Sequence, residues 1–154
     1  MATKVPLKFL RHVPSAPTPF YSTPASAGFD ISAIEEQVIF PYQITKKVCF
    51  VRTGLKVAFP EGYELQIRQR SGLSVKYPNY LANGIATIDA DYRGEILLPI
   101  VNWTQEPWLI LVGDRIAQGI VNPITQVDFQ DMTTRTGVLP ETSRGEGGFG
   151  STGR

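Results

Sequence analysis

The chain has 154 residues, and its 15 Lys and Arg against 14 Asp and Glu give a formal net charge of +1 at pH 7. This length fits one domain that buries about two thirds of the surface of its unfolded chain, and the near-neutral charge excludes a global field that steers a protein toward nucleic acid or an anionic membrane. One cysteine and one histidine exclude an internal disulfide and the Cys/His clusters that hold zinc.

The amino-terminal segment predicts an extended arm. Four prolines between residues 14 and 24 forbid a long helix there. Three basic residues interrupt the apolar residues of 1–13, so this stretch predicts neither a signal peptide nor a membrane-spanning helix. We therefore expect a soluble, intracellular protein without membrane or nucleic-acid partners, located in the cytoplasm or, in a eukaryotic or viral setting, in the nucleus.

The sequence assigns no chemistry to the single cysteine or the single histidine. Cys49 lies in the apolar run Val48–Val51, which is typical of a buried and inert thiol. His12 has no partner that the sequence can show, so it is interpreted as a solvated side chain. We therefore expect a carboxylate to act as the general base.

Short apolar runs bounded by glycine and proline predict extended strands. Residues 27–33 and 63–68 alternate apolar and polar side chains, which is the period of a half-buried strand, and Asp30 lies on the polar face. Further strands are expected at Val38–Phe40, Val48–Val51, Leu55–Phe59, Ile96–Val101, Leu109–Val112 and Ile116–Val121.

The breaks between these runs refine the fold class. Pro99 marks an edge strand or a bulge. The one expected helix is short, beginning at a capping Ser71 and ending at Tyr77 before a proline. The pattern predicts an all-β barrel or jelly roll over residues 1–143, followed by a flexible glycine-rich tail over residues 144–154.

The stretch Asn83–Glu95 combines a turn signal with two carboxylates and an aromatic side chain. Asn-Gly between extended runs predicts a type I′ hairpin turn, because both residues accept the positive φ that this turn needs. If the following segment is extended, Asp89 and Asp91 point to one face and Tyr92 points to the other. This arrangement favours a catalytic hairpin, and a polar surface loop is the alternative.

Other stretches carry groups that bind phosphate. Arg70-Ser71-Gly72 places a guanidinium, a hydroxyl and free backbone N–H groups at a helix amino terminus, with a surface ion pair as the alternative. Gln118 lies in an alternating strand and can bond either a ligand oxygen or solvent. The tail interleaves one aromatic and two hydroxyls with glycines that let backbone approach a phosphate, but it lacks the ending of a P-loop.

In their order and spacing these stretches resemble the five motifs of the trimeric dUTPase family, the deoxyuridine triphosphate nucleotidohydrolases. The resemblance implies a distorted β-barrel or jelly roll assembled as a homotrimer, with each active site built from several chains. It also implies hydrolysis of dUTP to dUMP and pyrophosphate with Mg²⁺, which limits uracil incorporation into DNA and supplies dUMP for dTMP synthesis. The matching segments are Ala27–Ala33, Arg70–Gly72, Asn83–Glu95, Gly113–Gln118 and Arg144–Gly153.

The resemblance also implies roles for single residues. Asp89 would activate the water that attacks the α-phosphorus, and Asp30 would support Mg²⁺ indirectly through water, the ion being held mainly by the substrate phosphates. Tyr92 would stack on the deoxyribose and exclude a 2′-hydroxyl, while Phe149 would stack on uracil once the tail closes. The implied substrate-binding residues are Arg70, Ser71, Gly72, Asn83, Gly84, Ile88, Tyr92, Gln118, Arg144, Phe149, Gly150, Ser151 and Thr152.

Two other functions remain open from the sequence. A dCTP deaminase resembles this fold and also uses an arginine-serine motif, although that family usually carries Trp where Tyr92 stands. A non-catalytic relative could bind dUTP as a regulatory switch. One departure from the dUTPase pattern is Ala86, where many relatives carry glycine, and it affects the expected hairpin geometry.

Overall fold

The computed structural model describes residues 4–77, 79–135 and 137–148. Contacts divide the chain into two compact units, Met1–Ile124 and Thr125–Arg154. The strands and helices of the described residues all belong to the first unit. The division into a body of residues 1–143 and a tail of residues 144–154 stays a prediction.

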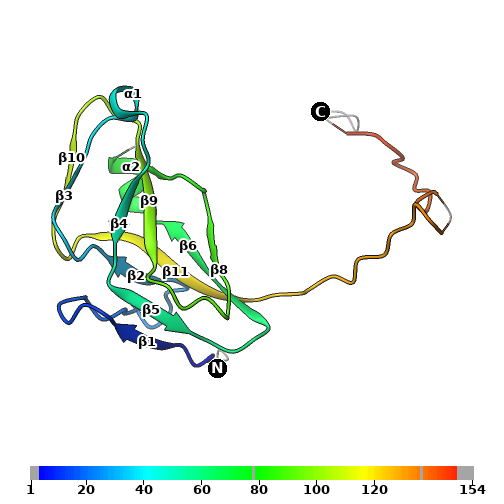
Figure 1. Ribbon diagram of the computed structural model, residues 1–154, viewed down its shortest axis with the longest axis horizontal. Helices are drawn as coiled ribbons and strands as arrows, with labels where there is room; N and C mark the ends of the chain where they lie inside the picture. The colour runs from blue at the N-terminus through cyan, green and yellow to red at the C-terminus, as the bar shows by residue number, and fades with distance from the viewer. Residues whose placement is uncertain (1–3, 78, 136, 149–154) are drawn as a thin grey trace. The chain divides into compact units, whose positions relative to one another are not determined.

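Eleven strands and two short helices follow one another along the described part of the first unit (Figure 1). Their bounds are β1 (Lys8–Arg11), β2 (Phe29–Ser32), β3 (Gln37–Ile39), α1 (Tyr42–Thr45), β4 (Cys49–Arg52), β5 (Leu55–Ala58), β6 (Tyr63–Gln69), α2 (Ser71–Lys76), β7 (Asn79–Leu81), β8 (Ala86–Ile88), β9 (Leu97–Asn102), β10 (Trp108–Ile110) and β11 (Arg115–Pro123). In the part of the chain that the structure describes, no helix has the length and apolar character that crossing a membrane requires.

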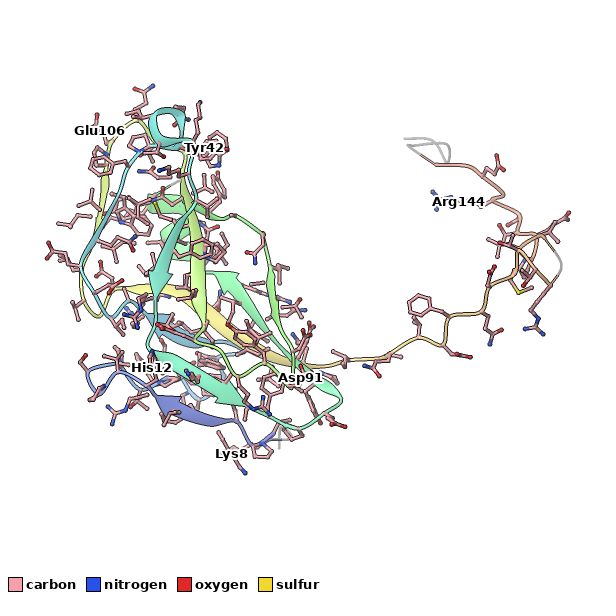
Figure 2. The ribbon with its side chains drawn as sticks, in the orientation of Figure 1. Lys8, His12, Tyr42, Asp91, Glu106 and Arg144 are labelled. Carbon is pink, nitrogen blue, oxygen red and sulfur yellow. The ribbon has the colours of Figure 1, made fainter. Side chains whose placement is uncertain are left out.

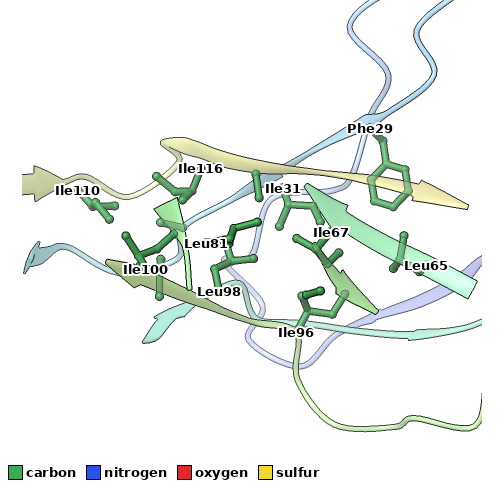
Figure 3. Packing of buried hydrophobic residues seen from close by; sticks show 14 of the residues in the cluster. Phe29, Ile31, Leu65, Ile67, Leu81, Ile96, Leu98, Ile100, Ile110 and Ile116 are labelled. Atoms are coloured by element: carbon green, nitrogen blue, oxygen red, sulfur yellow. The ribbon is translucent and has the colours of Figure 1, made fainter. Parts of the chain in front are cut away.

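Two antiparallel sheets form the main layers, and the hydrophobic core lies between them (Figure 3). One sheet has the strand order β2-β11-β6-β8 and the other has the order β4-β9-β7, while β1-β5 and β10-β3 form two-stranded sheets. Leu65 and Ile67 of β6 are buried against the same core as Leu98 and Ile100 of β9. Each such burial stabilises the fold by roughly 1.5–3 kcal/mol. The predicted all-β, jelly-roll class is confirmed.

Strand β2 is buried on both faces, so the prediction of a half-buried strand is wrong here. Phe29 and Ile31 enter the core as the alternation predicts, but Asp30 is also only 8% exposed. A bridge from the amino-terminal arm at Phe20 and pairing with β11 accompany this burial. The polar face of β2 is therefore an internal layer, where a carboxylate needs charged partners.

Pro99 lies in β9, the central strand of its sheet, so the predicted edge or bulge position is wrong. Its Cα is paired with Phe50 of β4, and its carbonyl accepts a hydrogen bond from Ala82 N at 2.7 Å. In a strand the N and C=O of one residue point to the same side. The nitrogen of Pro99 therefore faces the chain beyond Leu81, where β7 has ended and a ladder donor is not needed.

The segment around Asn83-Gly84 is not a hairpin. Its flanking strands belong to different sheets, because β7 pairs with β9 and β8 pairs with β6. Gly84 has φ of +68° and its N–H donates to Leu81 O at 2.9 Å, but Asn83 is not among the residues with positive φ, so the type I′ prediction is wrong. The turn instead carries the chain from one layer of the fold to the other.

Three short elements have no counterpart in the sequence prediction: β1, α1 and β7. β1 lies near the amino terminus and pairs antiparallel with β5, from Lys8 opposite Ala58 to Arg11 opposite Leu55. All four of its residues are exposed, so it carries no period that would distinguish a strand from the predicted extended arm.

Candidate functional site

A polar cleft of about 290 Å³ brings together three of the segments singled out in the sequence. Asp30 comes from β2, Arg70, Ser71 and Gly72 come from the junction of β6 and α2, and Gln118 comes from β11. These strands are neighbours because β11 pairs with β2 on one side and with β6 on the other. The register places Gln118 opposite both Asp30 and Arg68, so the sheet itself fixes the grouping.

Asp30 is the buried centre of this cleft. Its Oδ1 lies 2.8 Å from Arg70 Nε, and its Oδ2 lies 3.0 Å from Arg115 Nη1 and 3.1 Å from the Ser22 hydroxyl, which donates to it. One carboxylate thus orients two guanidinium groups whose own side chains remain 27% and 46% exposed. Arg70 lines the cleft, and the two arginines outnumber the one carboxylate, so the local charge favours an anionic ligand.

The junction of β6 and α2 supplies backbone donors. Arg70 occupies the N-cap position with extended φ and ψ of −82° and 134°, and it makes no side-chain capping bond. Ser71 is the first helical residue, so the prediction that it caps the helix is wrong; the Ser74 hydroxyl instead donates to Arg70 O at 2.9 Å. First-turn N–H groups lack intrahelical acceptors. Gly72 borders open space, so a ligand can approach them closely.

Gln118 is held in place from two sides. Its Nε2 donates to Gln69 O at 3.0 Å, which leaves a second N–H on the same nitrogen for a ligand. Its Oε1 lies over Gly28, where an added Cβ would come within 2.6 Å of that oxygen. A side chain at Gly28 would therefore displace the Gln118 amide from the cleft.

Ser22 and Ser26 also line the cleft, although neither was predicted as a site residue. Ser26 Oγ accepts a hydrogen bond from Thr23 N at 3.1 Å, which shapes the loop before β2. Both serines stand in the proline-punctuated arm, close before the Ala27–Ala33 segment. Their proximity to this segment could have marked the two serines as site residues, but a serine in a proline-rich segment is ordinarily a turn residue.

The second group of predicted residues lies elsewhere. β8 ends at Ile88, and the exposed Asp89 begins a turn in which Tyr92 N donates to Asp89 O at 3.1 Å. The segment after the Asn83-Gly84 turn is extended only through β8, so the assumption that it stays extended through Asp89, Asp91 and Tyr92 is wrong. Tyr92 is 42% exposed, and its hydroxyl donates to Glu95 O at 3.0 Å, which holds the ring in one orientation. Asn83 and Gly84 are exposed in the turn before β8.

The two groups stand at opposite ends of β6. Ile88 pairs with Leu65, whereas Arg70 directly follows the last residue of β6. Five residues at about 3.3 Å each separate Leu65 from Arg70, so about 16 Å of strand lies between the Asp89 turn and the cleft. The first unit of one chain therefore does not bring Asp89 to the predicted phosphate-binding residues.

A charge cluster anchors the end of the Asp89 turn. Glu95 Oε1 accepts from Gly54 N at 2.8 Å, and Oε2 accepts from Arg52 Nη2 at 3.0 Å and from His12 Nε2 at 3.1 Å. His12 N donates to Gly54 O at 2.9 Å, which places His12 beside the start of β5, where Figure 2 labels it. The interpretation of His12 as merely solvated is thus incomplete, because an 83-residue separation hides this partner from the sequence.

These contacts predict a pH-dependent contribution to stability. Burial raises the pKa of Glu95, but hydrogen bonds from Arg52, Gly54 N–H and His12 lower it below its ordinary value on balance. A carboxyl with a depressed folded-state pKa stabilises the fold above its unfolded pKa of about 4.3, and this contribution disappears as the pH falls through the folded value. Glu95→Gln should therefore lower Tm at pH 7 by roughly 5 °C. The difference in Tm between the variant and the parent protein should become smaller at acidic pH.

Thermal melting of both proteins between pH 3 and 7 measures this effect. Glu106→Gln is the matched control, since Glu106 is exposed and only its backbone oxygen accepts hydrogen bonds among the recorded contacts of the described residues. A constant gap between Glu95→Gln and the parent at every pH would contradict the assignment to ionised Glu95.

The tail residues belong to the second unit. Arg144 Nε donates to Gly147 O at 2.7 Å, and Gly147 N donates to Arg144 O at 3.1 Å, so a local turn forms at the start of the glycine-rich segment. Figure 2 labels Arg144 in this unit. The predicted contributions of Phe149, Gly150, Ser151 and Thr152 lie outside the described residues.

The described residues contain no group of three or more His, Cys, Asp or Glu side chains placed to hold a metal ion. Asp30 is the one carboxylate that lines the cleft, and both of its oxygens already accept from arginines. Such a donor set fits an ion that keeps its waters and binds phosphate oxygens, as Mg²⁺ prefers, rather than one enclosed by protein ligands.

Comparison with known proteins identifies the family. The protein-family model described as dUTPase matches residues 15–153. The deoxyuridine 5′-triphosphate nucleotidohydrolase of Finegoldia magna is 44% identical over 137 residues, which cover 89% of this chain and 92% of that protein. A point mutant of the dUTPase of Staphylococcus bacteriophage 80alpha, solved with dUpNHpp, aligns with a TM-score of 0.80 and 25% identity over 97% of this chain and 99% of that one.

A mutant of the dUTPase from phage phi11 of S. aureus, whose structure reveals the coordination of a structural Mg(II) ion, has the same fold, with a TM-score of 0.73 and 24% identity over 82% of this chain and 95% of that one. The family match spans most of the chain and includes all five segments that carry the predicted site. The chain belongs to the dUTPase family.

Proposed function

We propose that this protein hydrolyses dUTP to dUMP and pyrophosphate. The observation that carries the proposal is the cleft in which Arg70, Ser71 and Gln118 gather around the buried Asp30, in a chain of the dUTPase family. An intracellular, cytoplasmic protein fits this activity, because the substrate belongs to the nucleotide pool.

The cleft binds the triphosphate. Arg70 offers its guanidinium, α2 offers its first-turn N–H groups beside Gly72, and Gln118 offers the N–H that Gln69 leaves free. Charged and backbone donors of this kind neutralise and orient phosphate oxygens. Asp30 holds Arg70 and Arg115 in fixed directions, so little side-chain entropy is lost when the anion binds.

Asp89 accepts the proton of the attacking water. The water oxygen forms a bond to the α-phosphorus while the bond from that phosphorus to the α–β bridging oxygen breaks, and pyrophosphate leaves with the electron pair. A carboxylate performs this role when it lies within hydrogen-bond reach of the water. Asp89 is exposed at the end of β8 and therefore accessible to a bound substrate.

Mg²⁺ fits this site as an ion held by the substrate phosphates, with Asp30 contributing through water. When bound, it would neutralise phosphate charge that Arg70 leaves uncompensated. The residues of the chain supply position and charge, which is most of what phosphoryl transfer requires.

The turn and β8 provide selectivity for deoxyuridine. Tyr92, held by its bond to Glu95 O, presents a ring face that stacks on the deoxyribose and leaves no room for a 2′-hydroxyl. Backbone groups from Asn83 to Ile88 read the uracil edge. A base that leaves one buried polar group unpaired loses about 1–3 kcal/mol, which supports discrimination against cytosine.

A homotrimer completes the site. The Asp89 turn and the cleft are separated by about 16 Å of strand in one chain, so a second copy must bring Asp89 to the phosphates. The sheet β4-β9-β7 also exposes Phe50, Tyr80 and Leu97 on its outer face, at 57%, 48% and 42%. A contiguous apolar face of this kind supports burial against another subunit.

The tail closes over the bound triphosphate. Arg144 and the hydroxyls of Ser151 and Thr152 cap the γ-phosphate, and Phe149 stacks on uracil. Deleting residues 144–154 is expected to lower kcat/KM for dUTP by about 100-fold, because the closed tail supplies phosphate contacts and excludes water. Tm should change by less than about 2 °C, since Met1–Ile124 is compact by itself.

Steady-state kinetics and thermal melting of the truncated protein measure both quantities. Truncation after residue 150, which keeps Arg144 and Phe149 but removes both hydroxyls, separates the capping of the γ-phosphate from base stacking. Full activity of the 144–154 deletion would refute closure of the tail.

The proposed activity is tested by supplying dUTP, dCTP, dTTP and UTP with Mg²⁺ and identifying the nucleotide products and released pyrophosphate. Conversion of dUTP alone to its monophosphate is expected, with the other nucleotides at least about 100-fold slower. Deamination of dCTP, or tight dUTP binding without turnover, would overturn the proposal in favour of a deaminase or a regulatory binding protein.

A further inference from the structure

Helix α2 carries the Arg70-Ser71-Gly72 end of the cleft, yet it is only lightly attached to the rest of the first unit. None of its residues is buried, and Gly72 borders open space. Leu73 is partly buried against the core, and the following Tyr77 stacks on Trp108 with ring centroids 5.8 Å apart. The position of α2 therefore depends strongly on how its two ends are held.

Gln69 links these two ends. It is the last residue of β6, and its side-chain Nε2 donates to the backbone oxygen of Asn79, the first residue of β7. Asn79 is only 2% exposed, and its own side-chain amide has no hydrogen-bond partner among the described residues. Without Gln69, the Asn79 carbonyl would lose a donor at a position that water reaches poorly.

The same residue also orients the opposite wall of the cleft. The backbone oxygen of Gln69 accepts from Gln118 Nε2 at 3.0 Å, and Gln69 is paired with Ala117 in the β6–β11 ladder. The side chain of Gln69 thus fixes α2, while its carbonyl fixes the amide of Gln118. Gln69 therefore contacts both Asn79, which follows the end of helix α2, and the Gln118 amide on β11.

We propose that Gln69 is a positioning residue for the triphosphate, which sets the separation between the amino terminus of α2 and the Gln118 amide. This inference rests on the proposed hydrolysis of dUTP. Gln69 does not touch the substrate itself. It lowers the cost of binding by keeping the phosphate donors in one arrangement before the ligand arrives.

Gln69→Met tests the proposal, because methionine keeps the length of the side chain but cannot donate to Asn79 O. We expect the KM for dUTP and the inhibition constant of pyrophosphate with Mg²⁺ to rise together by about fivefold or more. The inhibition constant of 2′-deoxyuridine, which lacks phosphates, should stay within about twofold of the parent value, because the base and sugar contacts come from another segment.

Gln66→Met is the matched control, since Gln66 lies on the same strand and its amide bonds to Glu64 and Arg68 of β6 itself. Gln69→Asn, which is too short to reach Asn79 O, repeats the test with a polar residue if the methionine variant folds poorly. Thermal melting reports the fold of each variant.

The outcomes separate this inference from the proposed function. If the parent protein does not hydrolyse dUTP, the proposed function fails. If the parent is active but Gln69→Met lowers Tm without changing pyrophosphate inhibition, the role of Gln69 is only structural and the inference is overturned. Equal weakening of pyrophosphate and 2′-deoxyuridine also overturns it, because the effect would then not be specific to the phosphates.

Discussion

Asp89→Asn is expected to lower kcat for dUTP by about 1,000-fold or more. Asparagine keeps the shape of the side chain but cannot take a proton from the attacking water. Because Asp89 is exposed and its backbone carbonyl, not its carboxylate, accepts from Tyr92 N, the turn itself should persist. Affinity for a non-hydrolysable imido analogue of dUTP should therefore stay within about threefold, with Tm changed by less than about 2 °C.

Single-turnover kinetics, with titration of the analogue followed by calorimetry, separate chemistry from binding in this variant. Asp91→Asn removes the same charge two residues along the same turn and should retain turnover within about tenfold. Retained activity in Asp89→Asn together with loss in Asp91→Asn would transfer the role of general base to Asp91.

Asp30→Asn is expected to be the most destabilising single change among the residues of the cleft. The substitution leaves Arg70 and Arg115 facing an amide instead of a carboxylate at a site that is 8% exposed. Because the two guanidinium groups keep access to water at 27% and 46% exposure, the loss is about 1–3 kcal/mol, which corresponds to a decrease in Tm of about 5 °C. KM for dUTP should rise by about tenfold, because Arg70 is no longer oriented toward the cleft.

Thermal melting and dUTP kinetics at 15 °C, where the variant is folded, test both parts of this expectation. Asp128→Asn is the control, since Asp128 is exposed in the second unit and its Oδ2 accepts from Gln130 at 3.2 Å. An Asp30→Asn protein with the parent Tm would show that the two arginines do not depend on this carboxylate.

The strands that could be predicted from the sequence are those that bury one face against the core. Tyr63–Gln69 is the clearest case, because its alternation places Leu65 and Ile67 inside and leaves the residues between them partly exposed. The exposed strand β1 has no such alternation and was missed. Periodicity reports the environment of side chains, so a strand that pairs only by backbone bonds leaves little trace.

The errors at Pro99 and Asn83-Gly84 have a common physical origin. Local residue preferences describe which backbone angles a segment accepts, but they do not say which strand becomes its neighbour. Pro99 is accommodated in a central strand because β7 ends beside it, and the Asn83-Gly84 turn connects strands of different sheets. Both facts depend on pairing partners that are distant in the sequence.

The candidate site was predictable as a set of residues but not as a geometry. The motif pattern selected Asp30, Arg70 and Gln118, and the register of β2, β11 and β6 then brought them together. Glu95 and its partner His12 were not assigned roles, since only the folded chain places β1 beside the β4–β5 turn. The separation of Asp89 from the cleft likewise follows from register alone.

The location of the cleft and the Asp89 turn at opposite ends of β6 has a genetic consequence in the proposed trimer. Each chain then contributes its cleft to one reaction centre and its Asp89 to another. A chain with a defective turn still offers an intact cleft to its neighbour's carboxylate, and a chain with a defective cleft still lends its turn. Two alleles that are each inactive alone can consequently complement one another when their products assemble together, while a single defective allele impairs centres whose cleft is normal.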